Sequence, residues 1–486
     1  MHKEKMRYLR DKARVFLEVL RRDYWQESVP LAAECVVTEE PITLAEARQR
    51  SFRPVAKGEV WGGNWQCAWM HISGQIPAAW AGKRVVARLN LGGEGLLFDS
   101  DGNALQGLTD RSLFCREYIR DQYLVTEAAG GGETVEFYVD AAANDNFGLL
   151  LDDRPRRIED AVIGTVGRIA SLDLYSVDKT VLDLSYDLDI LVNLLQNTPD
   201  GYRARQLAAI ASRANDLYAG MPENAGKVRD YLQEAFFSMP ACASSMTAMA
   251  VGHAHIDTAW LWPLRETRRK CGRTFATQLA LIDRYPDYRF GASQPQHYQF
   301  VKEDYPDLYE RLKARVADGR WELQGGMWVE ADANLIGGES MIRQFLHGKN
   351  FFRDEFGVEV KSLWLPDVFG YSGALPQIIK GCGCDYFVTQ KLSWNNYNVF
   401  PHTTFRWRGI DGSEVLAHCP PENTYNGTMT PRDLGFGQNN FAESDVADAF
   451  LSLYGCGDGG GGPTEEQIEF ERERMRQASM LPKQTS

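Results

Sequence analysis

The chain has 486 residues, of which 44% are hydrophobic and 24% charged, which fits a globular protein of roughly two to four domains. Its formal net charge of −13 argues against a nucleic-acid partner, because phosphate groups bind to positive surfaces. No stretch reaches the roughly 18 consecutive apolar residues of a membrane span, so we expect no membrane partner either.

The first part of the chain predicts a helix followed by a β-sandwich. Charged and apolar residues alternate with a helical period over residues 1–30, without the apolar core of a signal peptide. Short runs such as 84–89 and 134–139 are typical of strands, and Gly, Asn and Asp separate them as turns. Aromatic side chains of such a sandwich either fill its core or stack on sugar rings. We place this first domain at residues 1–180.

A helical segment follows the predicted sandwich. Leucines recur with helical spacing from residue 182 to residue 195, and two further helices are predicted over 203–217 and 228–237. We interpret residues 181–245 as a helical linker between two larger domains.

The last part of the chain, residues 246–486, alternates strand-like with helix-like stretches. Such alternation predicts a parallel sheet or barrel with the functional groups at the C-terminal ends of its strands. The expected fold class is therefore α/β, preceded by a β-sandwich and a helical segment. The strand candidates are residues 247–255, 288–292, 321–325, 362–365 and 386–389.

Three potential metal ligands stand at the end of the first of these strands. His253, His255 and Asp257 occupy alternate positions, and side chains two residues apart in a strand point to the same face. Imidazole and carboxylate ligands together suit zinc or a similar divalent ion. The alternative is a pair of hydrogen-bonded histidines at a sheet edge.

Further polar residues follow other predicted strands. Asp367 follows the fourth, where it is either a placed carboxylate or the N-cap of the next helix. Glu330, Asp332 and Asn334 follow the third, beside a tryptophan. Aromatic faces combined with carboxylates and amides are typical of sugar sites. The Gly-rich stretch 455–464 lacks the Lys-Ser/Thr ending of a phosphate loop and is interpreted as a tight turn.

The cysteines predict a reducing environment. The sequence has nine, an odd number, and only Cys382 and Cys384 lie close together. In a long chain without a signal peptide such cysteines are expected to be reduced thiols that pack as small apolar side chains. We therefore expect a cytoplasmic protein.

Five motifs between residues 252 and 464 resemble glycoside hydrolase family 38, the class II α-mannosidases, most closely their cytosolic and bacterial branch. The residues before 245 resemble the N-terminal extension of that branch less specifically. The motifs, in chain order, are GHAHIDTAWLWP at 252–263, GGMWVEADANL at 325–335, WLPDVFGYSGALPQI at 364–378, QKLSWN at 390–395 and GDGGGGPT at 457–464.

This resemblance implies a seven-stranded (β/α) barrel-like catalytic domain that hydrolyses terminal α-mannosides of oligosaccharides or glycans and retains the anomeric configuration. It implies His255, Asp257 and Asp367 as ligands of one zinc ion, with cobalt as an open alternative. It also implies that Asp367 is the nucleophile, which forms a covalent glycosyl-enzyme that water then hydrolyses.

The resemblance also implies contacts with the sugar. Trp260 and Phe369 match family positions that contact it, and Asp332 lies in a matching motif, so all three are expected to bind substrate. The general acid of the family lies in a loop after the nucleophile. In this sequence the corresponding loop is residues 418–425, in which Glu422 is the candidate.

One departure from the family keeps other interpretations open. The fourth metal ligand of the family is a histidine in a Gln-Phe-His-Asp-type motif, which this sequence lacks, so we expect the chain to be the N-terminal part of a longer protein. With three ligands, the chain is alternatively a sugar-binding fragment without catalytic activity. A zinc-dependent carbohydrate deacetylase, in which the metal activates water, is a further alternative. For the full-length form we expect a homo-oligomer that acts on mannose-containing oligosaccharides.

Overall fold

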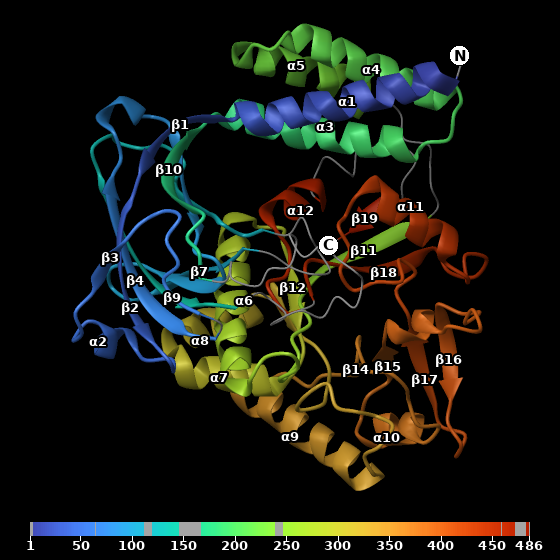
Figure 1. The fold of residues 1–486 in the computed structure, drawn as a ribbon. Helices are drawn as coiled ribbons and strands as arrows, with labels where there is room; N and C mark the ends of the chain where they lie inside the picture. Colours follow the sequence, from blue (N-terminus) through green and yellow to red (C-terminus); the bar gives the residue numbers. More distant parts are fainter. Residues whose placement is uncertain are drawn as a thin grey trace.

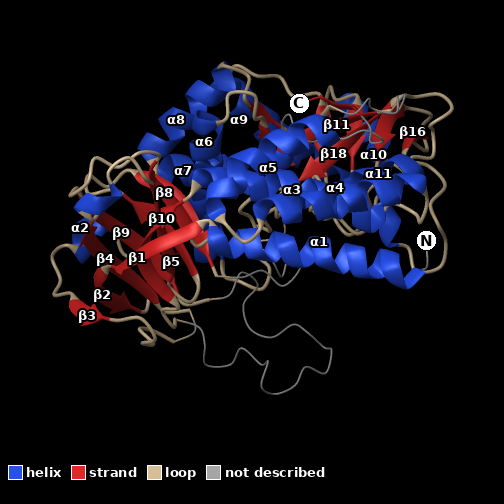
Figure 2. Cartoon of the chain, turned by 90° about the horizontal axis from the view of Figure 1, so that it is seen from above, coloured by secondary structure: helices blue, strands red, loops and turns tan. Residues whose placement is uncertain are grey.

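The computed structural model describes residues 3–63, 65–110, 119–144, 167–238, 246–457, 459–471 and 483–485. They form a mixed α/β structure with a group of helices, a β-sandwich and a unit of alternating strands and helices (Figure 1). In Figure 2 the sandwich lies at one end of the long helix α1. Within the described part of the chain, no helix has both the length and the apolar character that crossing a membrane requires.

The helical group joins the start of the chain to a segment far along it. Helix α1 packs against α3 and α4, although residues 24–178 lie between α1 and α3 (Figures 1 and 2). Phe16 and Leu20 of α1 belong to the same buried cluster as Leu188 and Leu191 of α3. The first helix is thus part of the helical group. The members are α1 (Lys3–Asp23), α3 (Lys179–Asn197), α4 (Tyr202–Tyr218) and α5 (Ala225–Leu232).

Two predicted helix boundaries were wrong. The helix expected over residues 1–30 ends at Asp23, because Trp25–Pro30 pairs with a later strand as β1. The helix expected to reach residue 237 is α-helical only to Leu232, and Gln233–Phe237 continues it as a π-helical turn. The helix predicted over 203–217 is confirmed as α4.

The predicted β-sandwich is present and begins earlier than expected. Its two antiparallel sheets enclose one core, to which Met70, Val85, Val139 and Leu174 contribute buried side chains. The short helix α2 (Leu44–Ala47) lies beside them. The first sheet has the order β1 (Trp25–Pro30), β10 (Ser171–Val177), β5 (Arg84–Asn90), β8 (Gln122–Thr126). The second has the order β3 (Arg53–Val55), β2 (Ala32–Thr38), β4 (Cys67–Gln75), β9 (Thr134–Ala142), β6 (Glu94–Phe98), β7 (Ala104–Thr109).

The described part of the α/β unit contains all five strands that the sequence predicts and four that it did not. One sheet has the order β13 (Trp321–Leu323), β12 (Phe290–Ala292), β11 (Thr247–His253), β18 (Ala449–Tyr454), with β19 (Lys483–Thr485) also paired to β11. The other has the order β14 (Ser362–Trp364), β15 (Tyr386–Val388), β17 (Glu414–His418), β16 (Thr404–Arg408). Every pairing is parallel except that of β16 with β17. The helices are α6 (Leu264–Arg284), α7 (Pro295–Asp304), α8 (Pro306–Ala317), α9 (Gly338–Phe356), α10 (Leu375–Gly381), α11 (Pro431–Asn440) and α12 (Glu465–Glu469).

A closed barrel is not confirmed. The parallel strands divide between two sheets, and no ladder of hydrogen bonds joins the two sheets in the described ranges. Side chains from both sheets nevertheless share one buried cluster, which contains Trp364 and Val388 of the second sheet and Leu453 of the first. The two sheets therefore pack against each other through side chains.

Helix α6 connects the sandwich to the α/β unit through buried charges. It packs against β6 and β7, and Glu266, Arg269, Lys270 and Arg273 are all buried along it. The Arg269 guanidinium contacts both oxygens of Asp140 on β9, with Nε–Oδ2 at 3.1 Å and Nη2–Oδ1 at 2.5 Å. Such two-pronged pairs fix the relative orientation of their partners.

Glu94 of the sandwich binds two cations of the same helix. Its Oε2 atom lies 2.6 Å from Lys270 Nζ and 3.0 Å from Arg273 Nη1. Asn144 donates a third hydrogen bond to this oxygen at 3.1 Å. Burial lowers the pKa of Lys270, and the Glu94 carboxylate opposes that shift. Opposite charges thus replace water at this contact.

Candidate active site

The structure brings three of the predicted ligands together. Candidate ligand atoms of His255, Asp257 and Asp367 all lie within 4.8 Å of one another. His255 Nε2 is 3.3 Å from Asp257 Oδ1 and 3.7 Å from Asp367 Oδ2. His255 and Asp257 follow β11 in one sheet, whereas Asp367 follows β14 in the other. One imidazole and two carboxylates are a donor set that suits zinc and similar divalent ions.

The Glu330 carboxylate contacts the ring nitrogen of His255 that faces away from Asp257 and Asp367, which is the arrangement expected if His255 binds a metal. His255 Nδ1 lies 2.7 Å from Glu330 Oε2, and Ser293 Oγ donates to Glu330 Oε1 at 2.5 Å. The histidine ring is 3% exposed, so it has little freedom to turn away. Metal-binding histidines commonly use their second nitrogen in this way, and the carboxylate fixes the ring with Nε2 toward the metal. This arrangement places Nε2 toward Asp257 and Asp367.

Asp367 is held by groups that the sequence-based prediction of the site omitted. Tyr425 Oη donates to Asp367 Oδ1 at 2.8 Å, and Lys391 Nζ forms an ion pair with the same oxygen. The other oxygen, Oδ2, faces His255. The Asp367 side chain is 17% exposed, so part of it remains open to solvent. The QKLSWN motif contains Lys391 and gave a signal for it, whereas no motif pointed to Tyr425.

Lys391 lies among aromatic rings. Its Nζ atom is 3.3 Å from the centroid of Trp394 and 4.6 Å from that of Phe369. An ammonium group over an aromatic face is attracted by the electrons of the ring. These contacts hold the positive charge of Lys391 next to the carboxylate of Asp367.

The Gly-rich stretch is a tight turn beside the site, as predicted. A bridge between Cys456 and Gly462 closes it, and Gly457 N donates to Asn426 Oδ1 at 2.6 Å. A Cβ atom on Gly457 would lie 3.2 Å from the backbone nitrogen of His255, so the turn packs against the ligand segment. Arg120 donates from the sandwich to carbonyl oxygens of this turn. Asp458 lies outside the described residues.

Family models match both large parts of the chain. The model described as the glycosyl hydrolases family 38 N-terminal domain matches residues 245–485. A model described as an alpha-mannosidase jelly roll domain matches residues 29–159. The chain belongs to glycosyl hydrolase family 38.

Curated relatives from this family match most of the chain. Alpha-mannosidase G of Dictyostelium discoideum is 38% identical over 88% of this chain and 39% of its own length. Human alpha-mannosidase 2C1 is 37% identical over 96% of this chain and 44% of its own length. The chain thus spans less than half the length of these relatives. Among solved structures, an alpha-mannosidase from Enterococcus faecalis V583 has 19% identity and a TM-score of 0.39, over 49% of this chain and 28% of that one.

His253 does not join the group of His255, Asp257 and Asp367 in this family 38 chain. The sequence had predicted that His253 points to the same strand face as His255 and Asp257, and this was wrong. Strand β11 ends at His253, so the period-two alternation does not continue to His255. His253 is fully buried and lies 5.5 Å from the Trp364 ring. Burial lowers its pKa to about 3, which keeps the ring neutral.

The predicted substrate contacts differ in their availability. Trp260 and Phe369 are 50% and 69% exposed, so each has ring surface that is open to solvent. The Asp332 carboxylate accepts hydrogen bonds from the backbone nitrogens of Asn334 and Leu335 at 2.6 and 2.9 Å. These bonds lower its pKa and shape its own loop. Substrate binding by all three residues stays a prediction.

Glu422 packs against α11 and β18. A Cβ atom on Gly437 of α11 would lie 3.0 Å from its carboxyl carbon, and Ser452 of β18 is the polar group beside it. Ser452 and Leu453 are neighbours in β18 and point to opposite faces, and it is Leu453 that joins the cluster shared by the two sheets. In the described residues no contact connects the Glu422 carboxylate to the ligand group. Burial raises its pKa to about 7.

A Glu422→Gln variant is expected to be more stable than the unchanged chain at alkaline pH. The pKa of Glu422 is about 7 in the folded chain, whereas the ordinary value for a glutamate, expected in the unfolded chain, is 4.5. The folded state therefore favours the protonated acid. Its stabilisation is complete below pH 4.5 and is lost as the pH rises through about 7. The difference in unfolding free energy between the variant and the unchanged chain should therefore rise by roughly 2–3 kcal/mol, in favour of the variant, from pH 5 to pH 8.

Urea unfolding of both proteins at the two pH values measures this difference. Glu339→Gln, at an exposed position of α9, is the matched control and should show no pH-dependent gain. An equal gain for both variants would contradict a buried, neutral Glu422.

Proposed function

We propose that this chain is the catalytic part of a metal-dependent retaining α-mannosidase that hydrolyses terminal α-mannosides of oligosaccharides or glycans. The observation that carries the proposal is the meeting of His255, Asp257 and Asp367 from two sheets, in a chain whose curated relatives are named alpha-mannosidases. Zinc is the proposed ion, and cobalt suits the same ligands. When bound, such an ion supplies positive charge that binds sugar hydroxyls and favours a distorted ring.

Asp367 is the proposed nucleophile. Its carboxylate attacks the anomeric carbon, the bond to the leaving oxygen breaks, and a covalent glycosyl-enzyme forms that water then hydrolyses. Lys391 and Tyr425 orient the carboxylate through Oδ1. Trp260 and Phe369 are proposed to offer their exposed faces to the sugar ring.

The leaving oxygen needs a proton donor, and the proposal names Glu422 for this role. Its raised pKa of about 7 suits a general acid at neutral pH. An aryl mannoside with a good leaving group needs little protonation, so Glu422→Gln should slow only substrates with poor leaving groups if it is the acid.

We further propose that the two sheets of the α/β unit are parts of one barrel-like (β/α) domain at residues 246–486. The shared cluster of Trp364, Val388 and Leu453 supports this, as does the ligand group that both sheets supply. The proposed boundaries at 180 and 245 fall next to the start of α3 at Lys179 and of β11 at Thr247.

All seven cysteines that the structure describes are free, which supports a cytoplasmic location. A mannose-containing oligosaccharide is the proposed partner. Homo-oligomer formation by the full-length protein stays a prediction.

A Glu330→Gln variant is expected to bind zinc about 10–100-fold more weakly than the unchanged protein, because the amide orients His255 less well than the carboxylate does. Elemental analysis after dialysis against a graded series of chelator concentrations measures the affinity. Glu310→Gln, at an exposed position of α8, is the matched control. Unchanged zinc affinity in Glu330→Gln would contradict the proposed role of this carboxylate.

Hydrolysis of p-nitrophenyl α-mannoside by the purified protein, together with its zinc content, tests the proposed function. Bound zinc and turnover are expected. Zinc with acetate release from an acetylated sugar would favour the deacetylase alternative. Sugar binding with neither zinc nor turnover would favour a non-catalytic fragment.

A further inference from the structure

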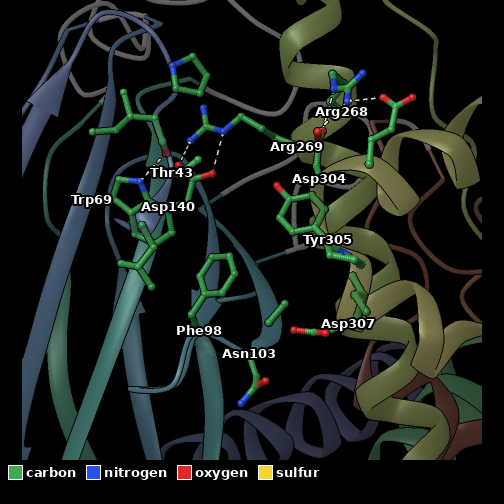
Figure 3. A pocket seen from close by; sticks show the side chains of 18 of the residues that line it. Thr43, Trp69, Phe98, Asn103, Asp140, Arg268, Arg269, Asp304, Tyr305 and Asp307 are labelled. Carbon is green, nitrogen blue, oxygen red and sulfur yellow. Dashed lines mark hydrogen bonds and ion pairs between the residues drawn. The ribbon is translucent and has the colours of Figure 1, made fainter. Parts of the chain in front are cut away.

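A cavity lies between the sandwich and the α/β unit, and none of its lining residues belongs to the group of His255, Asp257 and Asp367. Its volume is about 580 Å³, within the range of roughly 300–1,000 Å³ for small-molecule sites. One wall comes from the sandwich and includes Trp69 and Phe98. The other comes from α6, the end of α7, Tyr305 and the start of α8 (Figure 3). We call this cavity the interdomain pocket.

The charges on the walls of this pocket are largely neutralised. Arg268 contacts Glu303 at 2.7 Å and Asp304 at 2.6 Å. The other three lining arginines are paired as well: Arg265 with Glu40, Arg269 with Asp140 and Arg311 with Asp283. An anionic ligand such as a phosphate would therefore have to break an existing ion pair before it could bind.

Two polar groups of the pocket have no partner within the described part of the chain. The Tyr305 hydroxyl takes part in no hydrogen bond, and the Asp307 carboxylate contacts no cation. Figure 3 shows both side chains extending from the α7–α8 side toward the sandwich, with the Phe98 ring on the opposite wall. A phenol that donates and a carboxylate that accepts match the vicinal hydroxyls of a sugar.

Apolar surface accompanies these polar groups. Trp69 and Phe98 lie on the sandwich wall, and Leu308 lies on the wall opposite. Trp69 and Phe98 are only 5% and 7% exposed and pack against each other, so they form a closed apolar wall of the pocket, and the indole nitrogen of Trp69 donates to the carbonyl oxygen of Ile42 at 2.8 Å. A pyranose has an apolar face of C–H groups and a rim of hydroxyls, so it complements both kinds of surface.

We propose that the interdomain pocket is a second carbohydrate site that binds one neutral hexopyranose unit. The choice of mannose as that unit rests on the proposed function. A glycan could then bind the chain both at the group of His255, Asp257 and Asp367 and, through another sugar unit, at the interdomain pocket. Its sugar ring lies between Phe98 and Tyr305, and Asp307 accepts a hydrogen bond from a hydroxyl.

The test uses methyl α-D-mannopyranoside as the probe and isothermal titration as the measurement. The whole chain is titrated in an Asp257→Asn/Asp367→Asn background, in which the ligand group is altered and binding at the interdomain pocket remains. Binding is expected in this background. Addition of Tyr305→Phe and Asp307→Asn should weaken it by about tenfold or more, because two hydrogen bonds are lost.

Tyr8→Phe/Asp354→Asn, at exposed positions of α1 and α9, is the matched control and should bind as the background does. Thermal melting of each variant shows whether it folds. No binding in the background, or equal binding after the Tyr305 and Asp307 substitutions, would overturn the proposal. So would tighter binding of inorganic phosphate than of the sugar. Absence of aryl mannoside hydrolysis by the unchanged protein, with binding at the interdomain pocket intact, would refute the proposed function alone.

Discussion

Replacing Asp367 by asparagine is expected to lower kcat for an aryl α-mannoside by about 10⁴-fold or more in the protein that carries this chain. The amide has nearly the same shape as the carboxylate, but it cannot form the glycosyl ester. It also removes a negative charge next to His255 and Lys391. Steady-state hydrolysis of p-nitrophenyl α-mannoside measures the loss.

Asp367 is proposed both as the nucleophile and as a metal ligand, so the loss of the nucleophile has to be distinguished from the loss of bound zinc. Zinc content is therefore measured on the variant, and a slow fluorinated mannosyl substrate is used to trap the adduct on the unchanged protein. One sugar mass on the peptide that contains Asp367 is the expected result. Asp385→Asn, at an exposed position paired with Lys380, is the matched control and should keep its rate. Turnover by Asp367→Asn at the unchanged rate would contradict the assignment of the nucleophile.

Glu94→Ala is expected to lower the free energy of unfolding by about 3–5 kcal/mol, the second large effect. Glu94 is the shared partner of Lys270 and Arg273, and all three side chains are at most 5% exposed. Without the carboxylate, the two buried cations lose the counter-charge that they share, and Arg273 keeps only its pair with Glu266. Because the contact joins β6 to α6, the loss should also weaken docking of the sandwich onto the α/β unit.

Urea unfolding, followed by tryptophan fluorescence, measures this loss. Glu18→Ala breaks the exposed pair with Arg14 in α1 and is the matched control, with an expected change of about 0.5 kcal/mol or less. Equal changes in the two variants would contradict a structural role for the buried network.

The sequence predicted five of the nine strands that the structure describes in the α/β unit, and the site only in part. Each strand candidate from 247–255 to 386–389 contains a strand, because short apolar runs separated by helices have few other ways to bury their side chains. The three residues that meet after the strands, His255, Asp257 and Asp367, were among the predicted candidates. The motif at 252–263 placed His255 and Asp257 together, whereas the approach of Asp367 depends on how two sheets pack.

The contacts that escaped prediction are long-range ones. Tyr425 lies 58 residues after Asp367, and no local pattern indicates that its hydroxyl reaches that carboxylate. The face of His253 was mispredicted because alternation was extended past the end of β11. Glu422 was placed by its position in a loop, and a sequence does not reveal that this loop turns it toward α11.

The pairing of α1 with α3 has a consequence for synthesis on the ribosome. Residues 24–178 must be made before the partner helix of α1 exists, which takes about 10–30 s at usual elongation rates. During that time the buried face of α1, which includes Phe16 and Leu20, has no native cover. The nascent chain therefore passes through a stage in which this helix is a target for chaperones, and the sandwich can fold before the helical group closes.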